Sequence, residues 1–114
     1  MKALKLSAFI VICTLTEAHA SCNIQYYKWF WGSNTSTILT ASPNQSCGSH
    51  MNHRGTMLNS LTIISPAKLG KSYTYGLDWW GYQSKPGFKG DDHFVVRVSS
   101  DKGDSDIDVT VHIQ

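Results

Sequence analysis

The C-terminal end of the chain alternates between apolar and polar residues, and this pattern restricts the fold more than any other feature of the sequence. The apolar residues lie two positions apart in two successive runs, Phe94, Val96, Val98 and then Ile107, Val109, Val111, Ile113. Side chains two residues apart share one face of a β-strand, so both runs are predicted to be half-buried strands. Gly103 lies between the runs and favours a hairpin turn.

The same period of two recurs earlier in the chain, and no segment carries a sustained helical stripe of apolar residues. We therefore expect an all-β domain of about seven strands, separated by clusters of Gly, Pro, Asn and Ser. The predicted strands are Ile24–Trp31, Ser36–Ala41, Thr56–Ile64, Lys71–Tyr75, Trp79–Gln83, Asp92–Ser99 and Asp106–Ile113. Their number and spacing are typical of a β-sandwich.

Residues 1–20 have the pattern of a secretory signal peptide. Lys2 and Lys5 precede an apolar run from Ala8 to Leu15, and the segment ends in small residues at positions 18–20. The apolar run is too short to span a bilayer, which takes about 20 residues, and no second run of that length follows. The sequence predicts a secreted or periplasmic protein with one domain, residues 21–114, and no transmembrane segment.

The charge of the exported part is small. Removal of Lys2, Lys5 and Glu17 from ten basic and eight acidic residues leaves eight against seven, a net charge of +1. This balance provides neither a basic stripe for nucleic acid nor a polybasic patch for a membrane surface. No nucleic-acid partner is therefore expected, and the sequence does not indicate an oligomeric state.

Two cysteines, Cys22 and Cys47, remain after removal of the signal peptide. In an oxidising compartment a single pair predicts one disulfide, which ties the first strand to the middle of the domain. The alternative is a redox-active thiol pair, but the two residues lack the close Cys-x-x-Cys spacing.

The segment from Tyr82 to Phe94 resembles a motif of bacterial immunoglobulin-like and cadherin-like repeat modules, Tyr-x-Pro-x-x-Gly-Phe-x-Gly-x-Asp-x-Phe. Ser84 stands at the position of the proline in that motif. The resemblance implies an immunoglobulin-like antiparallel sandwich, as a small stand-alone secreted protein, with a structural corner at Pro86, Gly87, Phe88, Gly90, Asp92 and Phe94. In this corner Pro86 and Gly87 turn the chain, and Asp92 is expected to accept backbone N–H bonds.

A second segment, residues 47–57, combines soft metal ligands with glycine. Its candidate ligands are His50, Met51, His53 and Met57. Imidazole and thioether groups suit a periplasmic copper site, which makes a copper-binding protein the alternative function. A His-x-x-His pair on a loop fixes no coordination geometry, so the same residues also fit an ordinary loop beside a disulfide.

The acidic residues of the final hairpin offer oxygen ligands for calcium. They are Asp101, Asp104, Asp106 and Asp108, with Asp91 and Asp92 added if the corner lies close. Calcium needs six to eight oxygens, and a solvated hairpin that keeps an edge strand from pairing explains the same residues. We expect no resident cofactor, with copper and calcium as the two metals to test.

Aromatic residues form the predicted binding surface. Adjacent residues of a strand point to opposite faces, so Trp79 and Trp80 are not both in one core. Exposed Trp and Tyr side chains stack on sugars or anchor protein partners. The candidate ligand-binding residues are Trp29, Trp31, Trp79, Trp80 and Tyr82.

No catalytic arrangement of Ser, His and Asp or of Cys and His has a supporting motif, so the sequence predicts that the chain is not an enzyme. The favoured interpretation is a module that binds a protein or glycan partner through exposed aromatics or has a structural role at the surface. Inhibition of a host or rival enzyme stays open.

Overall fold

The computed structural model describes residues 21–52 and 55–114, and these contain eight strands and no helix. The strands are β2 (Cys22–Ile24), β3 (Thr35–Ala41), β4 (Ser46–His50), β5 (Leu58–Ser65), β6 (Lys71–Tyr75), β7 (Trp79–Gln83), β8 (Gly90–Ser100) and β9 (Gly103–Ile113). The predicted signal peptide, residues 1–20, lies outside the described residues. The prediction of an all-β domain is confirmed.

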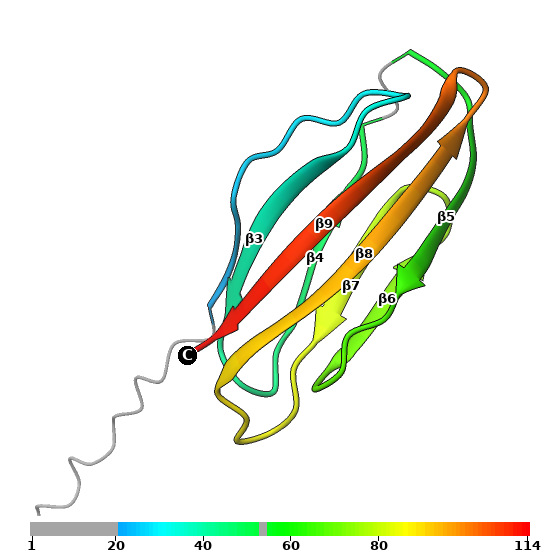
Figure 1. The fold of residues 1–114 in the computed structure, drawn as a ribbon. Coiled ribbons are helices and arrows are strands. Elements are labelled where there is room, and N and C mark those ends of the chain that lie inside the picture. Colours follow the sequence, from blue (N-terminus) through cyan, green and yellow to red (C-terminus); the bar gives the residue numbers. More distant parts are fainter. Residues whose placement is uncertain (1–20, 53–54) are drawn as a thin grey trace, which may run out of the picture.

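The strands form two layers (Figure 1). The larger sheet has the order β2-β3-β9-β8-β5 and the smaller sheet the order β4-β7-β6. β3 pairs with β9 in parallel, whereas every other pairing between named strands of the described chain is antiparallel. The expectation of a purely antiparallel sandwich is therefore wrong at one pair, because the first long strand lies beside the last and runs in the same direction.

The hydrophobic core lies between the two sheets. Phe94, Val96 and Val98 from β8 face Trp80 and Tyr82 from β7, and all five side chains have no exposed surface. The ring centroids of Tyr82 and Phe94 are 5.9 Å apart and nearly parallel. The alternation of β8 and β9 thus buries one face of each strand, as the sequence predicts.

One predicted strand, at the N-terminal end of the domain, is corrected. Only the first three residues of the N-terminal segment, Cys22–Ile24, pair as a strand, and the prediction of Ile24–Trp31 is wrong. Beyond Ile24 the Thr37 hydroxyl donates to the Gln25 carbonyl at 2.7 Å, and the backbone then leaves β3. Trp29 still points inward and is 3% exposed, so the alternation reflects burial without strand pairing.

The strand β4 is the eighth strand, which the sequence analysis interpreted as a loop. Its sequence, SCGSH, has one strongly apolar residue and low strand propensity. Pairing with β7 along its whole length, from Ser46 with Gln83 to His50 with Trp79, overrides that low propensity.

The disulfide between Cys22 and Cys47 is present, with the two Cα atoms 5.5 Å apart. It joins β2 of the larger sheet to β4 of the smaller one. Such a bond fits a protein of an oxidising, extracellular or periplasmic environment. Within residues 21–52 and 55–114, no helix is long and apolar enough to cross a membrane.

Candidate functional site

The outer face of the smaller sheet carries three aromatic side chains, Tyr73 and Tyr75 of β6 and Trp79 of β7. We call these three residues the aromatic platform. Tyr75 and Trp79 are direct cross-strand partners, and Tyr73 is two residues from Tyr75 on the same face. Tyr75 is 76% exposed, and the other two rings are half-buried.

Tyr73 lies flat across the sheet. Its backbone belongs to β6, its ring covers Gly81 of β7, and its hydroxyl is hydrogen-bonded to the Ser46 hydroxyl of β4 at 2.8 Å. A Cβ atom on Gly81 would lie 2.5 Å from the Tyr73 hydroxyl oxygen, so only glycine leaves room for this ring. One side of the ring rests on the sheet, and the other side faces outward.

Trp79 is held in a similar way by a second glycine. A Cβ atom on Gly48 would lie 2.7 Å from Nε1 of Trp79, which places the indole over Gly48 of β4. Gly48 and Gly81 are cross-strand neighbours, so the two rings cover adjacent points of the sheet. The rings form a strip that runs across the strands from β6 toward the β4 edge.

A hollow of about 420 Å³ lies over this strip and is lined by the platform with His50 and Asp78. Nε2 of His50 lies 3.1 Å from Oδ2 of Asp78, so the two polar side chains at the rim are bonded to each other. The hollow therefore presents aromatic surface with a polar rim at one end.

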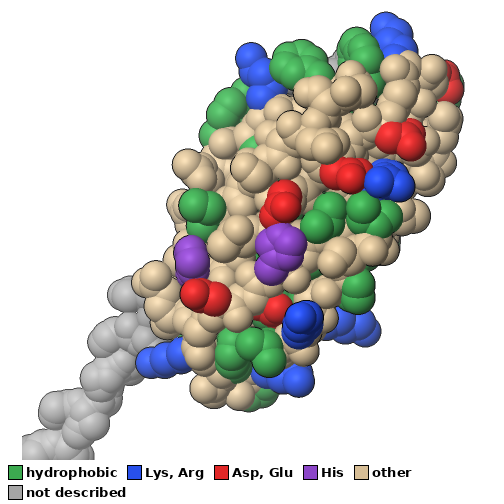
Figure 2. Space-filling view, in the orientation of Figure 1, with side chains coloured by type: hydrophobic (Ala, Val, Ile, Leu, Met, Phe, Trp, Pro, Cys, Tyr) green, Lys and Arg blue, Asp and Glu red, His purple; other side chains and the backbone are tan. Residues whose placement is uncertain are grey.

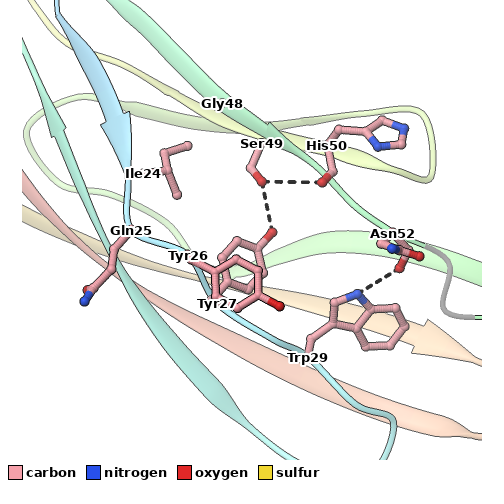
Figure 3. A pocket seen from close by; sticks show the side chains of 9 residues that line it. All are labelled: Ile24, Gln25, Tyr26, Tyr27, Trp29, Gly48, Ser49, His50 and Asn52. Carbon is pink, nitrogen blue, oxygen red and sulfur yellow. Dashed lines mark hydrogen bonds between the residues drawn. The ribbon is translucent and has the colours of Figure 1, made fainter.

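A second hollow, of about 440 Å³, lies between β4 and the segment after β2 (Figure 3). We call it the edge hollow. It is lined by Ile24, Gln25, Tyr26, Tyr27, Trp29, Gly48, Ser49, His50 and Asn52. The ring of Tyr26 stands 81% exposed at this hollow, whereas Trp29 is buried and donates from Nε1 to the Asn52 carbonyl at 2.9 Å.

The Tyr27 hydroxyl organises the inner side of the edge hollow. It accepts a hydrogen bond from Nε1 of Trp80 at 3.0 Å and lies 3.1 Å from the Ser49 hydroxyl. It also lies 3.4 Å from the sulfur of Met51. Burial raises the pKa of Tyr27 above its ordinary value, although the hydrogen bonds with Ser49 and Trp80 act in the opposite direction. The phenol stays protonated near neutral pH and offers a fixed hydroxyl.

Of the five aromatic residues predicted from the sequence to bind ligand, three belong to the core. Trp29 is 3% exposed, and Trp80 and Tyr82 have no exposed surface. A ligand on the outer face of the smaller sheet does not reach Trp80 or Tyr82, because the alternation of β7 directs both side chains between the sheets, whereas Trp29 lines the edge hollow. Trp79 lies on the opposite face, in the platform, and Trp31 is half-buried beneath the Lys102 ammonium group, 4.7 Å from its ring centroid.

The candidate copper ligands begin at the last residue of β4, a strand that the sequence did not predict, and continue into the segment that follows it. Met51 follows β4 and is fully buried, His50 is exposed, and Met57 is 65% exposed. His53 lies outside the described residues. In the described part of the chain, no group of three or more His, Cys, Asp or Glu side chains is arranged to hold a metal ion.

Several of the candidate calcium ligands pair with other side chains on the outer face of the larger sheet. Asp106 accepts two hydrogen bonds from Arg97, at 2.8 and 3.1 Å, and Asp108 pairs with His93. Asp91 pairs with His112 at 2.7 Å. Figure 2 shows these acidic, basic and histidine side chains intermixed on the face above β8 and β9. Asp101 and Asp104 are exposed near the hairpin.

The corner predicted from the family resemblance contains a tight turn. The Phe88 N–H donates to the Lys85 carbonyl at 3.3 Å, and Gly87 has φ of +75°. Proline followed by a glycine with positive φ is the pattern of a type II turn. Phe88 packs against the core and touches Gly90, which has φ of +142°.

Asp92 accepts a backbone N–H bond within the corner, as expected, because the His93 N–H donates to its carboxylate at 2.9 Å. The carboxylate also accepts backbone N–H bonds from Lys68, Leu69 and Gly70 at 2.9 to 3.0 Å, and the Tyr82 hydroxyl donates to it at 2.9 Å. The residue thus anchors the loop between β5 and β6 to the corner, which the sequence did not predict. Burial alone would raise the pKa of Asp92, but these hydrogen bonds outweigh burial and hold the pKa below its ordinary value.

Sequence reasoning missed most of the platform and its supports. Tyr73, Tyr75 and the glycines at 48 and 81 were not singled out, although the spacing in KSYTY places both tyrosines on one face of a strand. The signal was available in that alternation. The opposition of each ring to a glycine, however, depends on the register of three strands and is not visible in the sequence.

No protein-family profile and no curated protein matches this chain. Among solved structures, the chain is similar to an endo-fucoidan hydrolase of glycoside hydrolase family 107, with a TM-score of 0.49 and 15% identity. The match covers 75% of this chain and 13% of the hydrolase chain. The sequence analysis predicted that the chain is not an enzyme, and this match to an enzyme contradicts that prediction, which we withdraw. A likeness at this level does not assign an activity to the chain.

Proposed function

We propose that the chain is an exported, immunoglobulin-like module that binds a glycan on the aromatic platform. The order of pairing supports the immunoglobulin-like assignment. When β3 to β9 are lettered A to G, the smaller sheet pairs B with E and E with D, and the larger sheet pairs C with F and F with G. Immunoglobulin domains pair strands B to G in the same way, and β3, as strand A, differs from the ABED sheet because it pairs with β9. Export is supported by the sequence pattern of residues 1–20 and by the disulfide.

The observation that carries the proposed binding is the fixed, flat position of two rings. Tyr73 is held against Gly81 by its bond to Ser46, and Trp79 rests over Gly48. Because these rings are positioned before any ligand arrives, little side-chain entropy is lost when a ligand packs on them. A surface prepared in this way suits a flat, partly apolar ligand.

A sugar ring has this character. The C–H groups of one face of a pyranose form an apolar surface that packs on an aromatic ring, while its hydroxyls point sideways to polar partners. The platform offers the aromatic surface, and His50 and Asp78 lie beside it. The combination of apolar lining and a few placed polar groups is typical of small-ligand sites.

Size favours a glycan over a folded protein partner. A stable protein interface buries about 800 Å² on each side and about 20 to 30 residues. Three rings and their polar rim form a much smaller apolar patch, bounded by the exposed polar residues Ser46 and Lys71. A single glycan chain matches the width of this strip.

The test compares Trp79→Ala with Trp31→Ala on an array of immobilised oligosaccharides. The wild-type protein is expected to bind a subset of glycans, and Trp79→Ala is expected to lose at least tenfold in affinity, because one stacked ring and its buried area are removed. Trp31→Ala removes the same side chain outside the platform and is the matched control. Circular dichroism confirms that both variants are folded.

Two results would contradict the proposal. One is the absence of binding to any glycan by the wild-type protein. The other is an equal loss of binding in both variants, which would place the ligand elsewhere.

A further inference from the structure

The two hollows described above meet at the outer end of β4. Resting on the proposed glycan binding, we infer that the ligand is an extended, uncharged oligosaccharide that runs along the platform, crosses the β4 edge and continues into the edge hollow. Several units of the glycan are then bound, with stacking at one end and hydrogen bonding at the other.

Shared residues make the two hollows continuous. His50 lines both of them. Gly48 lines the edge hollow, and the indole of Trp79 covers this same glycine from the platform side. A ligand that leaves the Trp79 ring in the direction of β4 therefore arrives at the edge hollow with no intervening side chain at position 48.

The backbone of β4 supplies donors and acceptors at this crossing. The Met51 N–H donates to the Asp78 carbonyl at 2.6 Å, and the Ser84 N–H donates to the Gln45 carbonyl at 3.0 Å. In an antiparallel pair, such bonds recur at every second residue, so the backbone groups of Gly48 point away from β7. They face the edge hollow, where no described strand is hydrogen-bonded to β4.

The edge hollow has the chemistry of a sugar subsite. The hydroxyls of Tyr27 and Ser49 lie 3.1 Å apart on its inner side, and Gln25 and Asn52 line it as well. The ring of Tyr26, 81% exposed, also lines this hollow and offers a surface for stacking. Polar groups in a row with one exposed ring suit the hydroxyls and the apolar face of a second sugar unit.

The lining also indicates the charge of the ligand. Among the described residues that line the two hollows there is no lysine or arginine, and the one carboxylate, Asp78, is bonded to His50. Recognition of sulfate or carboxylate groups uses arginine or lysine. The site therefore suits a neutral glycan.

The length of the ligand follows from the two volumes. At about 420 and 440 Å³, each hollow alone falls within the range of about 300 to 1,000 Å³ that holds a small ligand. A glycan that occupies both must be longer than one that occupies the platform alone. Affinity is then expected to rise with chain length until both hollows are filled.

Isothermal titration calorimetry with neutral gluco-, manno- and xylo-oligosaccharides, from disaccharide to hexasaccharide, tests the inference. For the series that binds, the hexasaccharide is expected to bind at least tenfold more tightly than the disaccharide. Tyr26→Ala is expected to reduce this ratio about tenfold, because it removes the exposed ring of the edge hollow. Phe30→Ala, on the same segment but outside the lining, is the matched control and keeps the ratio.

The possible failures are distinguishable. Binding that does not increase with length, or a ratio unchanged by Tyr26→Ala, would overturn the extended site but leave the platform proposal standing. Tighter binding of a sulfated series than of the neutral one would overturn the assignment of an uncharged ligand. Failure of the wild-type protein to bind any glycan would overturn the proposed function as well.

Discussion

Asp92 is a carboxylate placed inside the domain, and its surroundings explain why it stays charged. Five donors point at it, namely the backbone N–H groups of Lys68, Leu69, Gly70 and His93 and the Tyr82 hydroxyl. A carboxylate accepts several such bonds because both oxygens have free lone pairs. The position therefore acts as a polar anchor between the end of the sandwich and the loop before β6.

Asp92→Asn tests this anchor. The amide keeps the shape of the side chain but turns one acceptor into a donor that faces N–H groups, and it removes the charge. We expect a loss of about 2 to 3 kcal/mol in the free energy of unfolding, the range for hydrogen bonds to a charged group. Urea denaturation at neutral pH measures it.

Asp91→Asn is the matched control for this substitution. Asp91 is the neighbouring residue, but it is exposed and pairs only with His112 among the described interactions. Exposed pairs of this kind contribute little to stability, so the control is expected to unfold close to the wild-type protein. Equal losses in the two variants would show that the anchor is no stronger than a surface ion pair.

The glycines at 48 and 81 contribute through the absence of a side chain. Each leaves space that an aromatic ring fills, Trp79 over Gly48 and Tyr73 over Gly81. In a strand interior a glycine usually weakens the sheet. The covering rings compensate for this loss and create the flat surface proposed to bind the ligand.

At the scale of elements, the sequence predicts the strands whose burial is one-sided and regular. β6 and β7 have the predicted bounds, and β8 and β9 exceed the predicted strands by a few residues at their ends. In these strands the apolar residues alternate with polar ones, so local pattern and tertiary structure agree.

The errors in strand prediction arise where the apolar alternation of a segment and its backbone pairing disagree. The segment Ile24–Trp31 alternates because Tyr27 and Trp29 point inward, but after Gln25 its backbone has no neighbouring strand. Conversely, β4 pairs along all of its length although SCGSH carries little apolar character. A third of the residues that line the edge hollow and the Ser46 support of Tyr73 belong to β4, so most of the candidate site could not be predicted from the sequence.

The disulfide compensates for the missing pairing between β2 and β4. These strands belong to different sheets, and among the described strands no backbone ladder joins them. The double variant Cys22→Ser/Cys47→Ser opens a loop of about 26 residues, which costs about 3.5 kcal/mol of stability in the chain-entropy account. Chemical denaturation of the oxidised wild-type protein and of the variant measures the difference.

Reduction of the wild-type protein provides the control for this prediction. It breaks the same bond without changing the sequence, so reduced wild-type protein and the double variant are expected to unfold at similar denaturant concentrations. A double variant as stable as the oxidised wild-type protein would contradict the prediction, because β2 and β4 would then stay together without the disulfide.

At the scale of the whole molecule, the two sheets are connected in two ways, through neighbouring residues of the smaller sheet, since Cys47 and Tyr82 are cross-strand partners. The disulfide joins β2 to β4. The hydrogen bond from Tyr82 of β7 to Asp92 of β8 joins the sheets through the core, and the loop before β6 is bonded to the same carboxylate. The disulfide is covalent and independent of pH, whereas the hydrogen bond joins two groups that titrate.

The hydrogen bond between Tyr82 and Asp92 predicts that the free energy of unfolding falls at both acid and alkaline pH. The pKa of Asp92 is lower in the folded state than in the unfolded chain, so its contribution is present above about pH 4 and is lost as the pH falls through the folded value. Burial, and then the Asp92 carboxylate, raise the pKa of Tyr82. Its contribution is therefore present below about pH 10 and is lost as the pH rises further.

The measurement compares each variant with the wild-type protein across pH by urea denaturation. The stability difference between wild type and Asp92→Asn is expected to be constant from about pH 6 to pH 8 and to shrink below about pH 4, because the wild-type carboxylate is then protonated. Tyr82→Phe removes the titrating hydroxyl. The difference in the free energy of unfolding between the wild-type protein and this variant is expected to become smaller above about pH 10. A difference for Asp92→Asn that stayed the same down to about pH 2 would mean that the pKa of Asp92 is equal in the folded and unfolded states, so that its charged form gains nothing from the five donors.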